Sequence, residues 1–201
     1  MKVKAEQEIK KIIDDNNFDA KIIGGRFFLN IEVSISSLKK FLESLKDNKE
    51  LRFTILTDLF AADFPEREKR FEIVYNLLSL KNNERVIIKT YCSEEELVPS
   101  VCDIFSAANW YEREIFDLFG VDFEGHPDMR RILTDYGFSG HPLRKDFPLT
   151  GYVQVTYDPA QEKVVNEPVK LQQAYRDFDF VSPWKGPENV LPGDEKANHN
   201  E

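Results

Sequence analysis

The character of this sequence changes near residue 121, and this change limits the folds available to the chain. Before it, apolar residues recur at helix or strand spacing along most of the sequence. After Val121 no such period is sustained, and most of the ten prolines lie there. We therefore predict one α+β globular domain over residues 1–120 and, over 121–201, an extension without a core of its own.

Helices and strands are expected to alternate at the start of the domain. Apolar residues on one face predict a helix over 3–16. Gly24 and Gly25 separate two short apolar runs, which is typical of a hairpin. The second run is expected to place four residues on one side: Phe27, Leu29, Ile31 and Val33. Serines from Ser34 onward precede a second helical stripe that ends near Asp47.

The rest of the domain is predicted to be a meander followed by two helices. The β-rich runs 52–64, 70–80 and 85–92 are divided by turn residues, which favours antiparallel pairing. A capping-box pattern at Ser93 and Glu96 predicts a helix reaching Ala108. Another helix should start at Asn109 and stop at Gly120. This order predicts a two-layer α+β domain, with helices packed on one mixed or antiparallel sheet of about five strands.

Composition excludes several classes of function. The formal net charge of -9 argues against a nucleic-acid partner, because phosphate binding needs a basic face. The longest apolar run, 59–62, is far shorter than the ~20 residues needed to cross a bilayer, so any membrane association should be peripheral. Neither a secretory signal nor a transit peptide is recognisable at the start. Cys92 and Cys102 are too few and too far apart for an iron–sulfur cluster, and a reducing compartment is expected.

The extension keeps more aromatic residues than a disordered linker normally does. They are Phe147, Tyr152, Tyr157, Tyr175, Phe178, Phe180 and Trp184. An ordered, extended C-terminal arm laid on a partner explains both the prolines and the aromatics. An arm folded back on its own domain fits the composition equally well. The residues from Gly193 onward are expected to fray.

Charged residues crowd the predicted helix after Asn109. Glu112, Arg113, Glu114 and Asp117 alternate there with apolar residues. Paired carboxylates can perform acid/base chemistry or bind a metal. The spacing favours a structural interpretation instead, in which the acids stabilise the helix N-terminus and Arg113 pairs with Asp117 at i, i+4.

Two Gly-His-Pro turns follow, at His126 and His141, each with basic residues after it. A metal site from these histidines with Asp128 or Asp146 lacks a helical two-histidine spacing, so histidines bonded to backbone are favoured. The basic residues are Arg130, Arg131, Arg144 and Lys145. Because aspartates lie among them, they favour a locked loop or a protein interface over phosphate binding.

The residues 110–121, Trp-Tyr-Glu-Arg-Glu-Ile-Phe-Asp-Leu-Phe-Gly-Val, and 126–133, His-Pro-Asp-Met-Arg-Arg-Ile-Leu, closely resemble the signature of the complex I 30 kDa subunit family. The similarity continues in short segments to Trp184 and includes the strand 70–79. It covers about 52–184, and residues before Leu51 match in pattern only. The departures are Phe116 where Trp is frequent, Ser139 for Glu, Gln154 and Thr156 for Glu and Arg, and Lys170 for an acidic residue.

The resemblance implies a docking subunit of the peripheral arm of a proton-translocating NADH:quinone oxidoreductase, itself without a redox centre. It implies binding to a relative of the D subunit (49 kDa type), with the B and I subunits nearby, and FMN, iron–sulfur clusters and quinone held by those partners. The expected location is peripheral, on the cytoplasmic side of a bacterial inner membrane or the matrix side in an organelle.

The expected interface combines signature residues with arm residues. Its members are Glu112, Arg113, Glu114, Asp117, His126, Arg130, Arg131, Arg144, Tyr175, Phe178, Phe180 and Trp184. No residue is assigned to catalysis, to a cofactor or to a metal. Three alternatives stay open at this point: the equivalent subunit of a membrane-bound hydrogenase, an acid/base hydrolase built on Glu112, Glu114 and His126, and a regulatory binding module.

Overall fold

The computed structural model describes residues 2–25 and 27–171. The chain divides into two compact units, Met1–Gly151 and Tyr152–Glu201. Residues 121–151 therefore pack with the α+β domain, although the sequence placed the end of that domain at residue 120. No helix in the described residues is both long and apolar enough to span a membrane.

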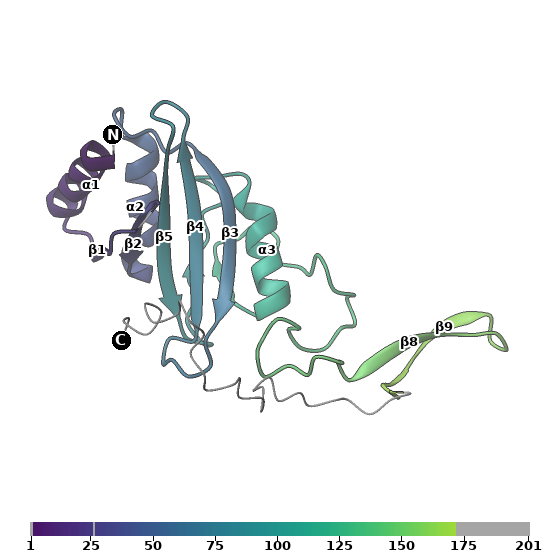
Figure 1. Ribbon diagram of the computed structural model, residues 1–201. Helices are drawn as coiled ribbons and strands as arrows, with labels where there is room; N and C mark the ends of the chain where they lie inside the picture. Colours follow the sequence, from purple (N-terminus) through teal and green to yellow (C-terminus); the bar gives the residue numbers. More distant parts are fainter. Residues whose placement is uncertain (1, 26, 172–201) are drawn as a thin grey trace, which may run out of the picture. The chain divides into compact units, whose positions relative to one another are not determined.

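The first unit is built on a five-stranded mixed sheet with the order β1-β2-β5-β4-β3 (Figure 1). Its strands are β1 (Ala20–Ile22), β2 (Leu29–Val33), β3 (Ile55–Asp63), β4 (Phe71–Ser79) and β5 (Glu84–Cys92). The β2–β5 pair is parallel and the other pairs are antiparallel. The predicted hairpin, the meander and the fold class are confirmed.

Three helices accompany this sheet: α1 (Lys2–Asn16), α2 (Ile35–Asp47) and α3 (Ala108–Phe119). Helix α2 packs against β5 and α3 against β3. Residues 71, 73, 75, 77 and 79 of β4 alternate onto one face and are all buried, so this face holds the core. The apolar stripe of α2, from Leu38 to Leu45, belongs to the same cluster.

Two local expectations are corrected. Strand β2 begins at Leu29, so Phe27 lies outside it and is exposed. The helix predicted from Ser93 to Ala108 is absent; the chain forms β6 (Val98–Pro99), which pairs in parallel with β7 (Phe123–Glu124). One hydrogen bond of the capping-box pattern is present, since the Ser93 N–H donates to Glu96 Oε2 at 2.9 Å. A proline at position 99 cannot continue a helix.

The described part of the second unit is a hairpin of β8 (Val153–Asp158) and β9 (Lys163–Pro168). Its strands are antiparallel, with Val153 opposite Pro168 and Asp158 opposite Lys163. The sequence had predicted no strand here.

Candidate functional site

Helix α3 carries the signature residues and ends where the sequence predicted. Gly120 closes it in the left-handed conformation, with φ 72° and its N–H bonded to the Phe116 carbonyl. A Cβ atom at Gly120 would lie 2.5 Å from the His141 ring and 2.7 Å from Arg144 Nη2. Glycine is therefore required both by the backbone angle and by the loop that crosses the helix end.

Glu112 does not sit at the start of α3, because the helix begins four residues earlier, at Ala108, and the side chain is fully buried. Its carboxylate accepts the Ser100 hydroxyl at 2.6 Å, the Val101 N–H at 2.8 Å and the Cys102 thiol at 3.3 Å. Burial raises the pKa of Glu112, and these donors partly offset the effect. The expected stabilisation of the helix N-terminus is corrected: Glu112 ties the segment after β6 to α3.

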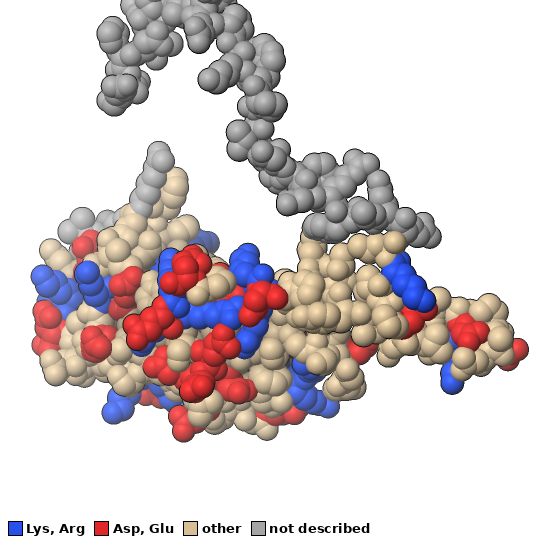
Figure 2. All heavy atoms as spheres, turned by 90° about the horizontal axis from the view of Figure 1, so that it is seen from below, with Lys and Arg blue, Asp and Glu red and all other residues tan. Residues whose placement is uncertain are grey.

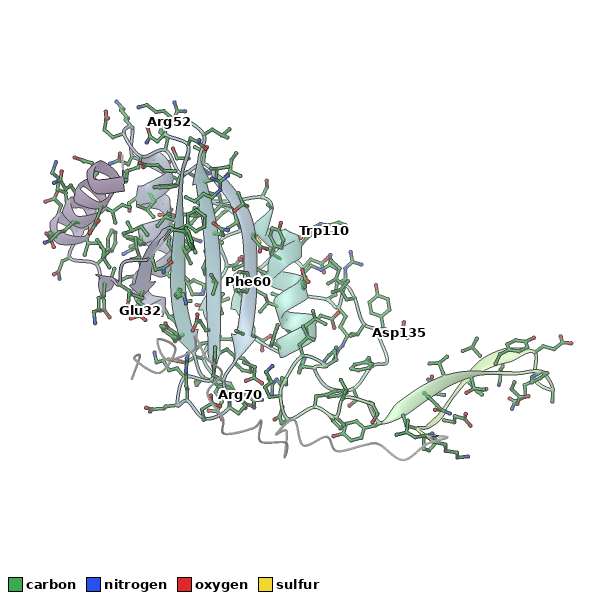
Figure 3. The ribbon with its side chains drawn as sticks, viewed as in Figure 1. Glu32, Arg52, Phe60, Arg70, Trp110 and Asp135 are labelled. Carbon is green, nitrogen blue, oxygen red and sulfur yellow. The ribbon has the colours of Figure 1, made fainter. Side chains whose placement is uncertain are left out.

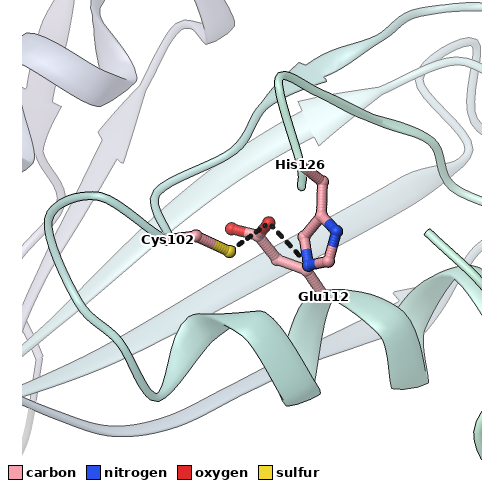
Figure 4. A group of neighbouring side chains, drawn as sticks. All are labelled: Cys102, Glu112 and His126. Carbon is pink, nitrogen blue, oxygen red and sulfur yellow. Dashed lines mark hydrogen bonds and ion pairs between the residues drawn. The ribbon is translucent and has the colours of Figure 1, made fainter. Parts of the chain in front are cut away.

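Cys102, Glu112 and His126 converge from three segments of the chain (Figure 4). Their ligand atoms lie within 4.8 Å of one another, the one such group within residues 2–25 and 27–171. His126 Nδ1 accepts the Asp128 N–H at 3.0 Å, so the ring proton sits on Nε2, 3.1 Å from the Asn109 carbonyl. A cation at this place would have to displace that proton and the thiol proton. The geometry is that of a closed hydrogen-bond network.

Asp117 is also fully buried and binds the loop that follows β7. Its carboxylate accepts the Arg131 guanidinium at 2.7 Å and the Thr134 hydroxyl. It also accepts three consecutive backbone N–H groups, those of Ile132, Leu133 and Thr134, at 2.7–3.1 Å. Burial alone would raise the pKa of Asp117, but these hydrogen bonds outweigh it and the pKa falls well below its ordinary range.

The predicted ion pair between Arg113 and Asp117 does not form. Arg113 donates instead to the carbonyls of Arg130 and Arg131, at 3.1 and 3.2 Å. The two signature side chains thus hold the same loop from two sides, one through its N–H groups and the other through its carbonyls.

Arg70 organises a second attachment at the far end of β3 and β4. Its guanidinium contacts Asp63 at 2.6 and 2.8 Å, Asp146 at 2.9 Å and Glu94 at 2.5 Å. Asp63 also accepts the Lys145 N–H at 2.7 Å. At this end of the sheet, positive and negative side chains are intermingled (Figures 2 and 3). The network fixes residues 145 and 146 to the sheet.

Arg70 was not identified as a site residue from the sequence, because the partners of Arg70 lie 7, 24 and 76 positions away. No spacing rule connects such distant residues. The only local signal was a strand beginning with a charged residue, which is also common without any network.

The remaining predicted site residues fall into three groups. Glu114 and Arg130 are exposed. Arg131 and Arg144 turn into the chain: Arg144 donates to the Phe119 and Gly120 carbonyls and to Glu94. The aromatic anchors Tyr175, Phe178, Phe180 and Trp184 lie outside the described residues.

Both turn histidines form hydrogen bonds with backbone carbonyl groups, as predicted. His141 Nδ1 lies 3.0 Å from the Asp117 carbonyl, and His126 contacts Asn109. The acid/base alternative is not supported, since Glu112 is sealed in the interior while Glu114, two residues on, is exposed. The two carboxylates therefore do not face one pocket, although His126 lies beside Glu112.

Comparisons with known proteins agree with the resemblance seen in the sequence. Residues 31–153 match the family described as the respiratory-chain NADH dehydrogenase 30 kDa subunit. The C subunit of the NADH-quinone oxidoreductase of Rickettsia bellii (strain RML369-C) is 63% identical over 169 residues, covering 84% of this chain and 86% of that protein. The C subunit of the same enzyme from Rhodobacter capsulatus is 53% identical over 179 residues, covering 89% of each.

A solved structure extends the likeness to another enzyme. A chain of the membrane-bound sulfane sulfur reductase, described as an archaeal respiratory membrane complex, matches with a TM-score of 0.61 and 30% identity, covering 73% of this chain and 86% of that one. The match to the family spans more than half of the sequence, and the relatives are similar over almost their whole length. This chain belongs to the 30 kDa subunit family of respiratory-chain NADH dehydrogenase.

Proposed function

We propose that this chain is a docking subunit of NADH-quinone oxidoreductase and holds no redox centre itself. Electrons from NADH pass through FMN and iron–sulfur clusters of other subunits to quinone, and this chain keeps those subunits in place. The identities of 53% and 63% to C subunits of that enzyme support it over the sulfur reductase, whose chain is 30% identical.

The observation that carries the proposal is the two-faced hairpin β8–β9. Alternation along the strands puts Val153, Val155 and Tyr157 on one face, and Val164 lies opposite Tyr157. All four side chains are more than half exposed. A two-stranded hairpin is marginally stable in water, so this apolar face needs a surface to cover it.

The other face of the hairpin satisfies its own polar groups. Glu167 accepts Gln154 Nε2 and the Thr156 hydroxyl, each at 2.8 Å. These bonds join the two strands. The apolar face is therefore the side of the hairpin that would be stabilised by contact with a partner. Full burial of one such side chain contributes about 1.5–3 kcal/mol, so two or three suffice for a specific contact.

The partner we propose for the arm is the relative of the D subunit (49 kDa type), with the B and I subunits nearby. In this arrangement Tyr175, Phe178, Phe180 and Trp184 are further apolar anchors, and Arg130 supplies a directional bond at the rim. The assembly is peripheral, on the cytoplasmic side of a bacterial inner membrane or on the matrix side in an organelle.

The test replaces the apolar face of the hairpin and leaves its polar face intact. Val155→Ser with Tyr157→Ser is expected to reduce comigration of the chain with NADH:quinone activity, after membrane solubilisation and native separation, by about tenfold or more. Thr156→Ser with Lys163→Gln changes the opposite face and should leave comigration unchanged. Equal comigration of both variants, or visible-range absorption from the pure chain, contradicts the proposal.

A further inference from the structure

The loop of residues 121–151 turns two of its four positive side chains inward. Arg131 retains a side-chain exposure of 17% and bonds Asp117, the Thr134 hydroxyl and the Gly140 carbonyl. Arg144, at 19%, bonds Glu94 and two carbonyls at the end of α3. Both guanidinium groups are therefore used within the chain.

The same loop turns large apolar side chains outward. Leu133 is 62% exposed, Tyr136 80%, Leu143 49% and Leu149 84%. We call these four residues the outward apolar set. Apolar residues exposed singly are ordinary, but four large ones between residues 133 and 149 are a concentration that calls for an explanation.

Backbone hydrogen bonds hold two members of the outward apolar set in place. Leu133 donates its N–H to Asp117, and Leu143 donates its N–H to the Leu118 carbonyl at 3.0 Å. Phe138 and Phe147 pack with ring centroids 5.8 Å apart. A surface that is ordered before binding loses less conformational entropy on contact than a mobile one.

Charge complementarity identifies the chemistry of the partner. Arg130 pairs with Asp128 at 2.8 Å, and Asp146 belongs to the ion-pair network at the end of the sheet. The exposed charges that then remain between residues 128 and 149, on Asp135 and Lys145, have opposite signs, and Asp135 points away from α3 (Figure 3). With its positive groups consumed inside or balanced, this part of the loop offers no net charge to an acidic peptide, an anionic lipid or a nucleic acid.

We propose that the outward apolar set docks against an uncharged, apolar surface of a neighbouring subunit of the same enzyme. This inference rests on the proposed docking function and adds a second contact, in the first compact unit, to that of the hairpin. Arg131 and Arg144 were expected to contact the partner directly. In this proposal they instead hold the loop whose apolar side chains make the contact.

The experiment compares two double variants in the assembled enzyme. Leu133→Ser with Tyr136→Ser removes apolar surface, and Asp135→Asn with Lys145→Gln removes the exposed charges while keeping the surface. The first is expected to lower comigration with NADH:quinone activity about tenfold at both low and high KCl. The charge variant and the wild type should comigrate equally at both salt concentrations. Amide exchange of residues 131–134 verifies that the loop stays folded in both.

Four outcomes overturn the inference. Full comigration of the Leu133 and Tyr136 variant shows that the surface is unused. Loss of the charge variant, or stripping of the wild type by KCl, shows that the partner is charged. A dimer of the purified chain that disappears in the Leu133 and Tyr136 variant shows that a second copy is the occupant. If the hairpin variant detaches while the loop variant does not, this inference alone fails; if neither detaches, the docking function fails with it.

Discussion

The first compact unit is held together in two different ways. The five-stranded sheet packs by burying apolar side chains from α1, α2 and the strands in one continuous cluster. Residues 121–151 contribute few members to that cluster and are attached through buried charges, chiefly Asp117 and the Arg70 network. Apolar burial tolerates many substitutions of similar size, whereas a buried charge depends on each of its partners.

The largest effect is expected in the sheet domain. Phe41 of α2 has no exposed surface and meets the Phe18 ring edge to face at 5.6 Å. Phe41→Ala should lower the free energy of unfolding by about 3–5 kcal/mol, because it leaves a cavity in the core. Urea denaturation followed by circular dichroism measures the change. Phe60→Ala, on β3 and 46% exposed, is the control, and an equal loss there would contradict the assignment of the core.

The next effect should be confined to the loop. Asp117→Asn removes the charge that pairs with Arg131 and weakens the bonds to three N–H groups, at an expected cost of about 2–4 kcal/mol. Hydrogen exchange should show fast amides at residues 132–134 while the amides of β4 stay protected. Glu114→Gln, on the exposed side of the same helix, should change neither region.

Lowering the pH should also distinguish the apolar packing of the sheet from the attachment of the loop through buried charges. The pKa of Asp117 is lower in the fold than its ordinary value of 3.8, so its contribution to stability is present above that value and is lost as the pH falls through the folded-state pKa. The stability difference between the wild type and Asp117→Asn should therefore be constant from neutral pH to about pH 5 and shrink as the pH falls below about 4. A difference that does not shrink below about pH 4 would mean that the carboxylate charge is not what holds the loop.

A smaller effect is expected where the loop crosses the end of α3. Gly120→Ala needs a strained backbone angle and also pushes against His141 and Arg144, so about 1–3 kcal/mol should be lost. Gly125→Ala has a similar φ of 82° but nothing within 4 Å of the added carbon, so it isolates the backbone cost, about 1 kcal/mol. If thermal unfolding shows the same loss of stability in both variants, the loop that crosses the end of α3 moves aside without an energetic cost.

The sheet domain was predictable because periodicity reports burial directly. Both helices before residue 50 and all five strands of the sheet lie close to their expected ranges. The false helix before Ala108 shows the limit of the method. Val101, Ile104, Phe105 and Ala108 are buried as the stripe required, but consecutive turns, such as the N–H of Phe105 to the Val101 carbonyl, give the same spacing without a helix.

The attachments of the loop were not predictable, because their partners are close only in the folded chain. The i, i+4 rule pointed to Arg113 as the partner of Asp117, because Arg113 is the basic residue nearest to Asp117 in the sequence. The actual partner, Arg131, is 14 positions away and wins because its loop also supplies three N–H groups to the same carboxylate. Spacing in the sequence cannot reveal stabilisation that comes from several hydrogen-bond donors of one distant loop.

Two adjacent arginines give the smallest predicted effect and the sharpest form of the comparison. Arg130 has a 61% exposed side chain and bonds only a half-exposed Asp128 among the contacts of its guanidinium that the structure describes, so Arg130→Gln should change stability by about 0–1 kcal/mol. Its carbonyl, which Arg113 uses, is unaffected by the substitution. Arg131→Gln strips the buried Asp117 of its cation and should cost several times more in the same urea titration. Equal effects at the two positions would show that the loop is held by its backbone bonds alone and that the charge inside it contributes nothing.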